Sequence, residues 1–163
     1  MDSELIYQEK LCSVRTTGLF LLLMLIFFSL GTWRWTRSGG SLLTWVLLGF
    51  SGLFLFYVVN FRTLAIHLDR EIFQVRFGLI RWRVPLANIA SVERDVIPWF
   101  LRNGGAGVHL FLSGGLYRVN FNFLEHARLL IRFKEKAGPV QALSFSTRQP
   151  EMLTTVIQQH LEA

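Results

Sequence analysis

The chain contains a single cysteine, Cys12, among its 163 residues. One thiol cannot form a disulfide within the chain, so an internally cross-linked fold is excluded. Cys12 lies just before a long apolar run, where a buried, unreacted thiol is the favoured interpretation and palmitoylation of the thiol is the alternative. The four histidines are far apart and lack the spacing of metal ligands, so we expect no metal site. These histidines are His67, His109, His126 and His160.

The motifs of the common enzyme classes are also missing. No serine has the glycine-flanked context of a nucleophile, and the glycine-rich run at 104–107 lacks the lysine and following helix of a phosphate-binding loop. No pair of carboxylates has the pattern of an acid–base site. We therefore expect a protein that is not an enzyme and uses no cofactor. The alternative is a membrane enzyme with an unrecognised site, in which His109, His126 and an acid converge.

Nucleic acid is not an expected partner. The chain has 17 Lys and Arg against 11 Asp and Glu, which is a modest basic excess. No recognition helix or RNA-binding signature accompanies that excess. Most of it lies after residue 61, as expected for a domain near an anionic surface.

Charge is almost absent from two apolar runs, at 18–35 and 42–61. The second run has no charged residue, and the first has only Arg34 near its end. As helices they would be about 27 and 30 Å long, which matches the hydrocarbon core of a bilayer. The apolar fraction of 52% and the mean hydropathy of +0.39 agree with this interpretation. The runs predict a transmembrane helical hairpin and not a signal peptide, because no cleavage site follows the first run.

The short connector at 36–41 places both ends of the hairpin on the same side of the membrane. Basic residues flank the hairpin on that side, whereas the connector region carries fewer. The flanking residues are Lys10, Arg15, Arg62, Arg70 and Arg76, against Arg34 and Arg37 at the connector. This bias favours cytoplasmic termini in a multi-pass protein of the cell (inner) membrane. No ionisable residue lies in the middle of either run, so no ion or proton path is expected.

From residue 62 the apolar pattern changes to the alternation of half-buried strands. Segments with this pattern lie at 63–68, 73–77, 80–84, 88–94, 108–112, 117–123, 129–133 and 143–145. Gly78 and the pair Gly114–Gly115 favour tight turns. The closing segment, 150–161, returns to helical periodicity, with Pro150 in its first turn. Seven or eight strands followed by one helix predict an antiparallel sandwich or barrel with the helix at an open end.

The stretch GLIRWRVPLANIASVE, residues 78–93, resembles the bacterial pleckstrin-homology-like (PH-like) domain family. The matching positions are Gly78, Leu79, Pro85, Leu86, Ile89 and Val92, and 143–158 resembles the family's last strand and helix entry. The resemblance covers about residues 62–161, whereas VNFNFLEHAR at 119–128 departs from the pattern. It implies an α+β membrane protein with an N-terminal segment and transmembrane hairpin at 1–61. A PH-like antiparallel β-barrel or sandwich with a C-terminal helix would occupy 62–163.

Two groups of residues are candidates for binding. Arg81 and Arg83 are expected to lie on an outward sheet face, together with Arg76, Arg118 and Arg132. Near an anionic leaflet each such charge contributes about 1 kcal/mol of attraction. The alternative is an ordinary solvated strand face.

The second group is Trp99, Phe100 and Arg102, in the segment IPWFLR. These side chains are expected to contact the lipid interface or a groove of a partner. The alternative is that the aromatic rings fold under their loop and close the barrel.

The resemblance and these residues predict an integral membrane protein that presents a PH-like domain at the membrane surface. The domain would be a non-catalytic, lipid-proximal or protein-interaction module. Its partners would be the lipid bilayer and either anionic phospholipid headgroups or a membrane protein. The alternative is an accessory or assembly subunit of a larger membrane complex, with the helical hairpin as its interface through Gly49 and Gly52.

Overall fold

The computed structural model describes residues 5–95, 107–113, 115–123 and 125–161. The helices are α1 (Val14–Ser38), α2 (Leu42–Asn60) and α4 (Pro150–Leu161), with a short 3-10 turn, η1 (Leu86–Asn88). The first strands are β1 (Leu5–Cys12), β2 (Thr63–Asp69), β3 (Ile72–Phe77), β4 (Ile80–Pro85) and β5 (Ile89–Arg94). The later strands are β6 (Gly107–Ser113), β7 (Leu116–Asn122), β8 (Ala127–Ala137) and β9 (Val140–Thr147).

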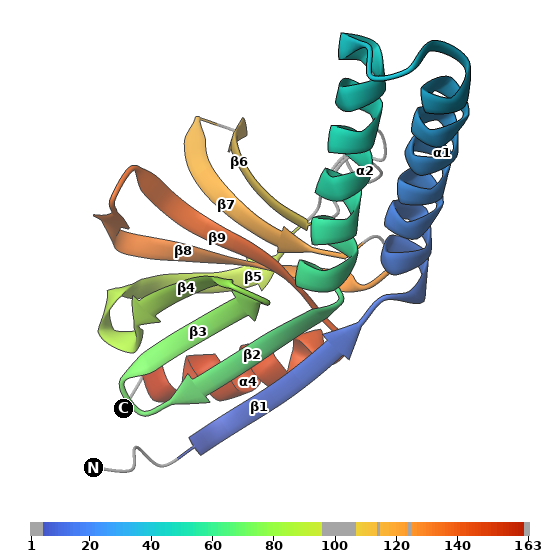
Figure 1. The fold of residues 1–163 in the computed structure, drawn as a ribbon. Coiled ribbons are helices and arrows are strands. Elements are labelled where there is room, and N and C mark those ends of the chain that lie inside the picture. The colour runs from blue at the N-terminus through green and yellow to red at the C-terminus, as the bar shows by residue number, and fades with distance from the viewer. Residues whose placement is uncertain (1–4, 96–106, 114, 124, 162–163) are drawn as a thin grey trace.

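Helices α1 and α2 form the predicted helical hairpin, and both are long and apolar enough to cross a membrane. Each begins at a serine cap: the Ser13 hydroxyl accepts a hydrogen bond from the Thr16 N–H at 2.9 Å, and Ser41 does the same for Thr44. The Ser51 hydroxyl donates to the Met24 carbonyl at 3.2 Å across the hairpin. The two helices lie side by side and extend away from one end of the sheets (Figure 1).

The hairpin helices contact each other through Gly31 and Ser51. A Cβ added at Gly31 would lie 2.7 Å from Cδ2 of Leu48, so α2 approaches α1 closely at this point. Gly49 and Gly52, in contrast, have no neighbour within 4 Å of an added Cβ. Gly31 and Ser51 therefore lie where the two helices meet, whereas Gly49 and Gly52 face away from α1.

The strands form two sheets and not a closed barrel. The first sheet has the order β1-β2-β3-β4 and is antiparallel, and the second has the order β5-β8-β9-β7-β6 (Figure 1). Within the second sheet β7 and β9 pair in parallel, which corrects the expectation of a wholly antiparallel domain. The reason is that β8 pairs with β5 and not with β7. Strand β9 then folds back along β8 and runs in the same direction as its other neighbour, β7.

Strand β1 lies in the predicted N-terminal segment, before the hairpin. It pairs with β2 from Cys12 opposite Thr63 to Tyr7 opposite Leu68, so the segment before α1 belongs to the first sheet. The hairpin is thus inserted between two neighbouring, hydrogen-bonded strands. The predicted strands after residue 62 and the C-terminal helix are confirmed, with boundaries that differ by a few residues.

The inner faces of the two sheets share one core. Phe73 on β3 lies 5.1 Å from Phe145 on β9, and Phe77 lies 6.0 Å from Phe121, both between ring centroids. The α4 side chain of Leu153 is fully buried with them. Each fully buried ring or leucine contributes about 1.5–3 kcal/mol to folding, so the contacts between the sheets contribute strongly to the fold.

Aromatic rings continue from this core into the helical hairpin. The ring of Phe61, just after α2, lies 5.4 Å from Phe77 in the core and 5.3 Å from Tyr57 in α2. Phe20 in α1 lies 5.3 Å from Tyr57. The packed rings therefore join the base of the hairpin to the sheets and restrict their relative movement.

Candidate functional site

The outer face of the first sheet is the surface that carries the predicted arginines. Phe73, Val75 and Phe77 of β3 point into the core, so the alternate residues of that strand point outward. Arg76 lies directly opposite Arg81 on β4. On its other side Arg76 lies opposite Ala65 of β2.

The same row of residues extends to β1, where Lys10 lies opposite Ala65. Lys10, Ala65, Arg76 and Arg81 therefore cross all four strands of the sheet at one level, with neighbouring strands about 4.8 Å apart. We call these four residues the basic row. Its three charged residues are exposed.

The charges of the basic row have no acidic partner in the described part of the chain. No hydrogen bond or ion pair there involves the side chain of Lys10, Arg76 or Arg81. Like charges that face each other directly across two strands destabilise a sheet. The Arg76–Arg81 pair therefore carries a cost in fold stability that an anion placed over it would remove.

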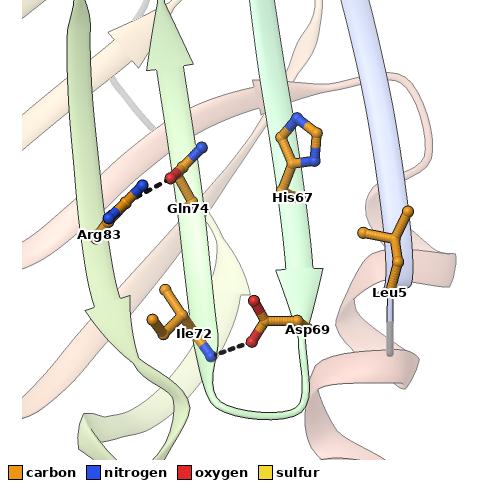
Figure 2. A pocket seen from close by; sticks show the side chains of 6 residues that line it. All are labelled: Leu5, His67, Asp69, Ile72, Gln74 and Arg83. Atoms are coloured by element: carbon orange, nitrogen blue, oxygen red, sulfur yellow. Dashed lines mark hydrogen bonds between the residues drawn. The ribbon is translucent and has the colours of Figure 1, made fainter. Parts of the chain in front are cut away.

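The next outward row contains Gln8, His67, Gln74 and Arg83. The Arg83 Nε donates a hydrogen bond to the Gln74 Oε1 at 2.6 Å. His67, Gln74 and Arg83 line a shallow depression of about 340 Å³ together with Leu5, Asp69 and Ile72 (Figure 2). Arg81 and Arg83, the predicted pair, thus lie on one face, and Arg83 is held against a neighbouring side chain.

Among the outward-facing residues of the described strands of this sheet, the acidic residue is Asp69. It lies in the row farthest from the hairpin. Its Oδ1 accepts hydrogen bonds from the backbone N–H groups of Ile72, at 2.6 Å (Figure 2), and of Glu71, at 2.8 Å. The carboxylate therefore stabilises the β2–β3 turn. It lies two rows away from Arg76, so it does not neutralise the basic row.

The turn between β3 and β4 fixes the position of the basic row relative to the helical hairpin. The side-chain Oδ1 of Asn60, the last residue of α2, accepts a hydrogen bond from the Leu79 N–H at 2.8 Å. The Leu79 side chain is 85% exposed. Arg76 and Arg81 each lie two residues along the strands from this turn, which is about 7 Å. The basic row therefore lies just beyond the end of α2.

Arg118 and Arg132 do not lie on this face, which corrects the expectation that all five arginines share it. Both belong to the second sheet. The Arg118 Nη1 lies 3.0 Å from the Asp95 Oδ1 in a buried ion pair, and Asp95 also accepts a hydrogen bond from Ser144 at 2.5 Å. Arg132 pairs with Glu93 at 2.7 Å. Alternation along one strand predicts a face, but it does not show to which sheet the strand belongs.

The second predicted group lies outside the described residues. Nothing in the structure tests the roles expected for Trp99, Phe100 and Arg102. Within the described ranges, no three His, Cys, Asp or Glu residues gather into a group that could hold a metal ion. His126 lies near the base of the hairpin, with its Nε2 3.5 Å from the Cys12 carbonyl oxygen.

Sequence reasoning missed Lys10 and Ala65 as members of the site. In β1, the strand that carries Lys10, the charged residue Glu9 faces inward. Glu9 therefore breaks the alternation of apolar and polar residues from which the strand would have been predicted. Glu9 accepts hydrogen bonds from Tyr7, Thr147 and the Arg148 N–H, at 2.9, 2.7 and 2.9 Å. These contacts join β1 to the end of β9.

No family model, curated protein or solved structure matches this chain.

Proposed function

We propose that this chain is an integral membrane protein whose β domain, of the bacterial PH-like family, lies at the membrane surface as a non-catalytic module. The domain is lipid-proximal, and the outer face of its first sheet contacts anionic headgroups. Both chain termini lie on the cytoplasmic side of the cell membrane. The observation that carries the proposal is an exposed apolar hairpin inserted between two paired strands whose outer face is basic.

The surface of the hairpin supports a location in lipid. Most of the large apolar side chains of α1 and α2 point away from the sheets and are not covered by the rest of the chain. Leu22, Phe28 and Leu55, for example, are all more than half exposed. An apolar patch of this extent in water would favour aggregation, whereas a bilayer removes its contact with water.

The connections between the hairpin and the sheet support a fixed placement of the domain. A single residue, Ser13, separates β1 from α1, and two residues, Phe61 and Arg62, separate α2 from β2. Because β1 and β2 are also hydrogen-bonded to each other, the sheet follows the helices directly. A bilayer that contains the helices therefore has the basic row near its surface.

The order of elements supports the PH-like assignment. The stretch that resembles the family contains Gly78 of the β3–β4 turn and then forms β4, η1 and β5. The second sheet leads into α4, which packs beside β5. The chain thus has two sheets followed by a C-terminal helix, which is the order of elements that the resemblance implies.

Membrane insertion is tested by fractionation and by cysteine labelling. We expect the full chain to stay with membranes after an alkaline carbonate wash. The Cys12 thiol is exposed, which corrects the expectation of a buried thiol. It should react with an impermeant maleimide only when the cytoplasmic side is opened. Ser38→Cys in a Cys12→Ser background should react from the opposite side. Release of the chain by carbonate, or both thiols reacting from the same side, would contradict the proposal.

The alternative function, an accessory subunit that binds a membrane complex through the hairpin, is favoured by one observation. Gly49 and Gly52 lie on an open side of α2 and are not used to contact α1. Small residues on an open helix face allow close approach of another helix in lipid. If this function holds, Gly49→Leu with Gly52→Leu should release a stoichiometric partner during native purification. Gly18→Leu, at an equally open glycine of α1, should retain it.

A further inference from the structure

We infer that the basic row is a binding site for the phosphate group of an anionic phospholipid. The ligand is a lipid of the leaflet that the helices enter on the side of the β domain, so the inference rests on the proposed membrane insertion. The site consists of Lys10, Arg76 and Arg81 around the small side chain of Ala65.

Depth in the membrane is the first argument. Helix α2 has 19 residues, about 29 Å at 1.5 Å per residue, which matches a hydrocarbon core of about 30 Å. The headgroup layers add about 5–8 Å on each side. The basic row lies about 7 Å along the strands from the β3–β4 turn, which is held at Asn60, the end of α2. The strands run obliquely to the helices (Figure 1), so the row lies less than about 7 Å farther from the hydrocarbon core than the turn. This depth falls within the headgroup layer, which contains the lipid phosphates.

Charge is the second argument. Three cations lie at one level of the sheet, and Arg76 and Arg81 oppose each other directly. Among the described residues none of the three side chains has an acidic neighbour within ion-pair distance. A phosphate between them relieves the repulsion and gains charge-assisted hydrogen bonds, since guanidinium groups bind phosphate oxygens in a bidentate manner.

The side chain of Ala65 is the third argument. It stands between Lys10 and Arg76 in the row and has only a Cβ. Lys10 and Arg76 are thus separated by about twice the strand spacing, roughly 10 Å, with no side chain of any length between them. This space admits a phosphate group that both cations reach, with Ala65 beneath it.

A lipid is a better occupant than a soluble phosphate because of Leu79. This residue stands at the tip of the β3–β4 turn, on the hairpin side of the row, and its side chain is 85% exposed. Val59, one residue before the end of α2, is 71% exposed beside the same turn. Apolar side chains at the hydrocarbon boundary and cations one step farther out match the two parts of a phospholipid.

The test uses the full chain in an uncharged detergent, titrated with dioctanoyl phosphatidylglycerol, dioctanoyl phosphatidylcholine or inorganic phosphate. Native mass spectrometry counts the bound molecules. We expect saturable binding of phosphatidylglycerol. Each of Lys10→Gln, Arg76→Gln and Arg81→Gln should weaken it about fivefold, as for a charge worth about 1 kcal/mol at an anionic leaflet. The triple variant should bind phosphatidylglycerol no better than phosphatidylcholine.

A matched triple variant controls for net charge. Lys134→Gln, Lys136→Gln and Arg148→Gln remove the same number of charges from exposed positions around the second sheet. This variant should bind phosphatidylglycerol like the wild type. Ala65→Glu keeps all three cations and places a carboxylate among them, so it should abolish binding. Ala90→Glu, at an exposed position of β5, should not.

The outcomes separate this inference from the proposed function. If the chain leaves the membrane fraction in alkaline carbonate, the proposed insertion fails, and the inference fails with it. If the chain stays in membranes but the two triple variants lose binding equally, or the two lipids bind equally, the lipid site alone is overturned. Binding of inorganic phosphate as tight as that of phosphatidylglycerol would assign the row to a soluble anion instead.

Discussion

The side chain of Asn60 and the backbone of Leu79 join the last turn of α2 to the β3–β4 turn through a hydrogen bond of 2.8 Å. Gly78 precedes Leu79 with φ of +49°, and an added Cβ would lie 2.3 Å from Asn60 Oδ1. The contact is possible only because residue 78 has no side chain. It holds the strands that carry Arg76 and Arg81 at a fixed distance from the helix.

Gly78→Ala should therefore destabilise the fold more than an ordinary substitution in a turn. Gly138→Ala, in the β8–β9 turn, is the control, because Gly138 has φ of +67° and no neighbour within 4 Å of an added Cβ. Both variants carry the backbone cost of about 1–2 kcal/mol for a left-handed non-glycine residue. Only Gly78→Ala adds the clash with Asn60. Urea unfolding of the full chain in detergent should show the larger loss for Gly78→Ala, and equal losses would mean that the turn moves freely away from α2.

Asp95→Ala should cost about 3–5 kcal/mol of unfolding free energy, because it removes the carboxylate that faces the buried charge of Arg118. The Asp95 side chain is only 3% exposed. Glu93→Ala removes the acid of the half-exposed Glu93–Arg132 pair and should cost about 0–1 kcal/mol. Denaturant titrations followed by tryptophan fluorescence compare the two. A small effect of Asp95→Ala would show that the Arg118 charge is satisfied without Asp95.

The stability of the fold should fall between pH 10 and 12 because of Tyr7. Burial, assisted by the hydrogen bond to Glu9, raises the pKa of Tyr7 from 10.0 to about 12. Below pH 10 the phenol is neutral in both folded and unfolded chains, so its full contribution is present. Between pH 10 and 12 the unfolded chain loses the proton and the folded chain keeps it, which favours unfolding.

Tyr7→Phe should reduce the steepness of this fall in Tm above pH 10. Tyr117→Phe is the control, because Tyr117 is exposed on β7 and makes no such contact with Glu9. The measurement is the melting temperature of each variant at pH 8 to 11.5. If the Tm of the wild type and that of Tyr7→Phe fall in parallel above pH 10, the raised pKa of Tyr7 does not cause the loss of stability.

Gly31→Leu should separate the hairpin helices, since even a Cβ at this position lies 2.7 Å from Leu48. Overpacking of this kind costs about 1–3 kcal/mol. Gly49→Leu, on the open side of α2, should leave the hairpin intact. The two variants are compared by thermal unfolding in detergent. If Gly49→Leu lowers the thermal stability as much as Gly31→Leu does, both glycines lie at the contact between α1 and α2.

The hairpin and the strands after residue 62 were predictable because their signals are local. Uncharged runs of sufficient length indicate the helices, and alternation indicates strands such as β3, where every second residue is buried. The outward position of Arg81 and Arg83 follows from the same alternation. Nothing local, however, indicates that β8 pairs with β5, which makes β7 and β9 parallel neighbours.

The missing parts of the site depend on contacts between distant segments. Strand β1 was not predicted because Glu9 faces inward, where Thr147 and Arg148 donate hydrogen bonds to it. Without β1 there is no reason to place Lys10 beside Arg76. The asparagines of VNFNFLEHAR, which fit no pattern, are Asn120 and Asn122. Both are buried, on the face of β7 opposite to Phe121. Such positions are determined by the assembled sheet and not by the neighbouring sequence.

The insertion of the hairpin between β1 and β2 has a consequence for how the protein is made. Strand β1 leaves the ribosome before either helix, and its partner leaves after both. In a chain with only one helix across the bilayer, the two strands would be on opposite sides and could never meet. If the hairpin spans the bilayer as proposed, completion of the first sheet therefore requires that the second helix crosses as well as the first. A chain inserted with the wrong topology would expose an unpaired β2 edge, by which a quality-control protease could distinguish it from a correctly inserted one.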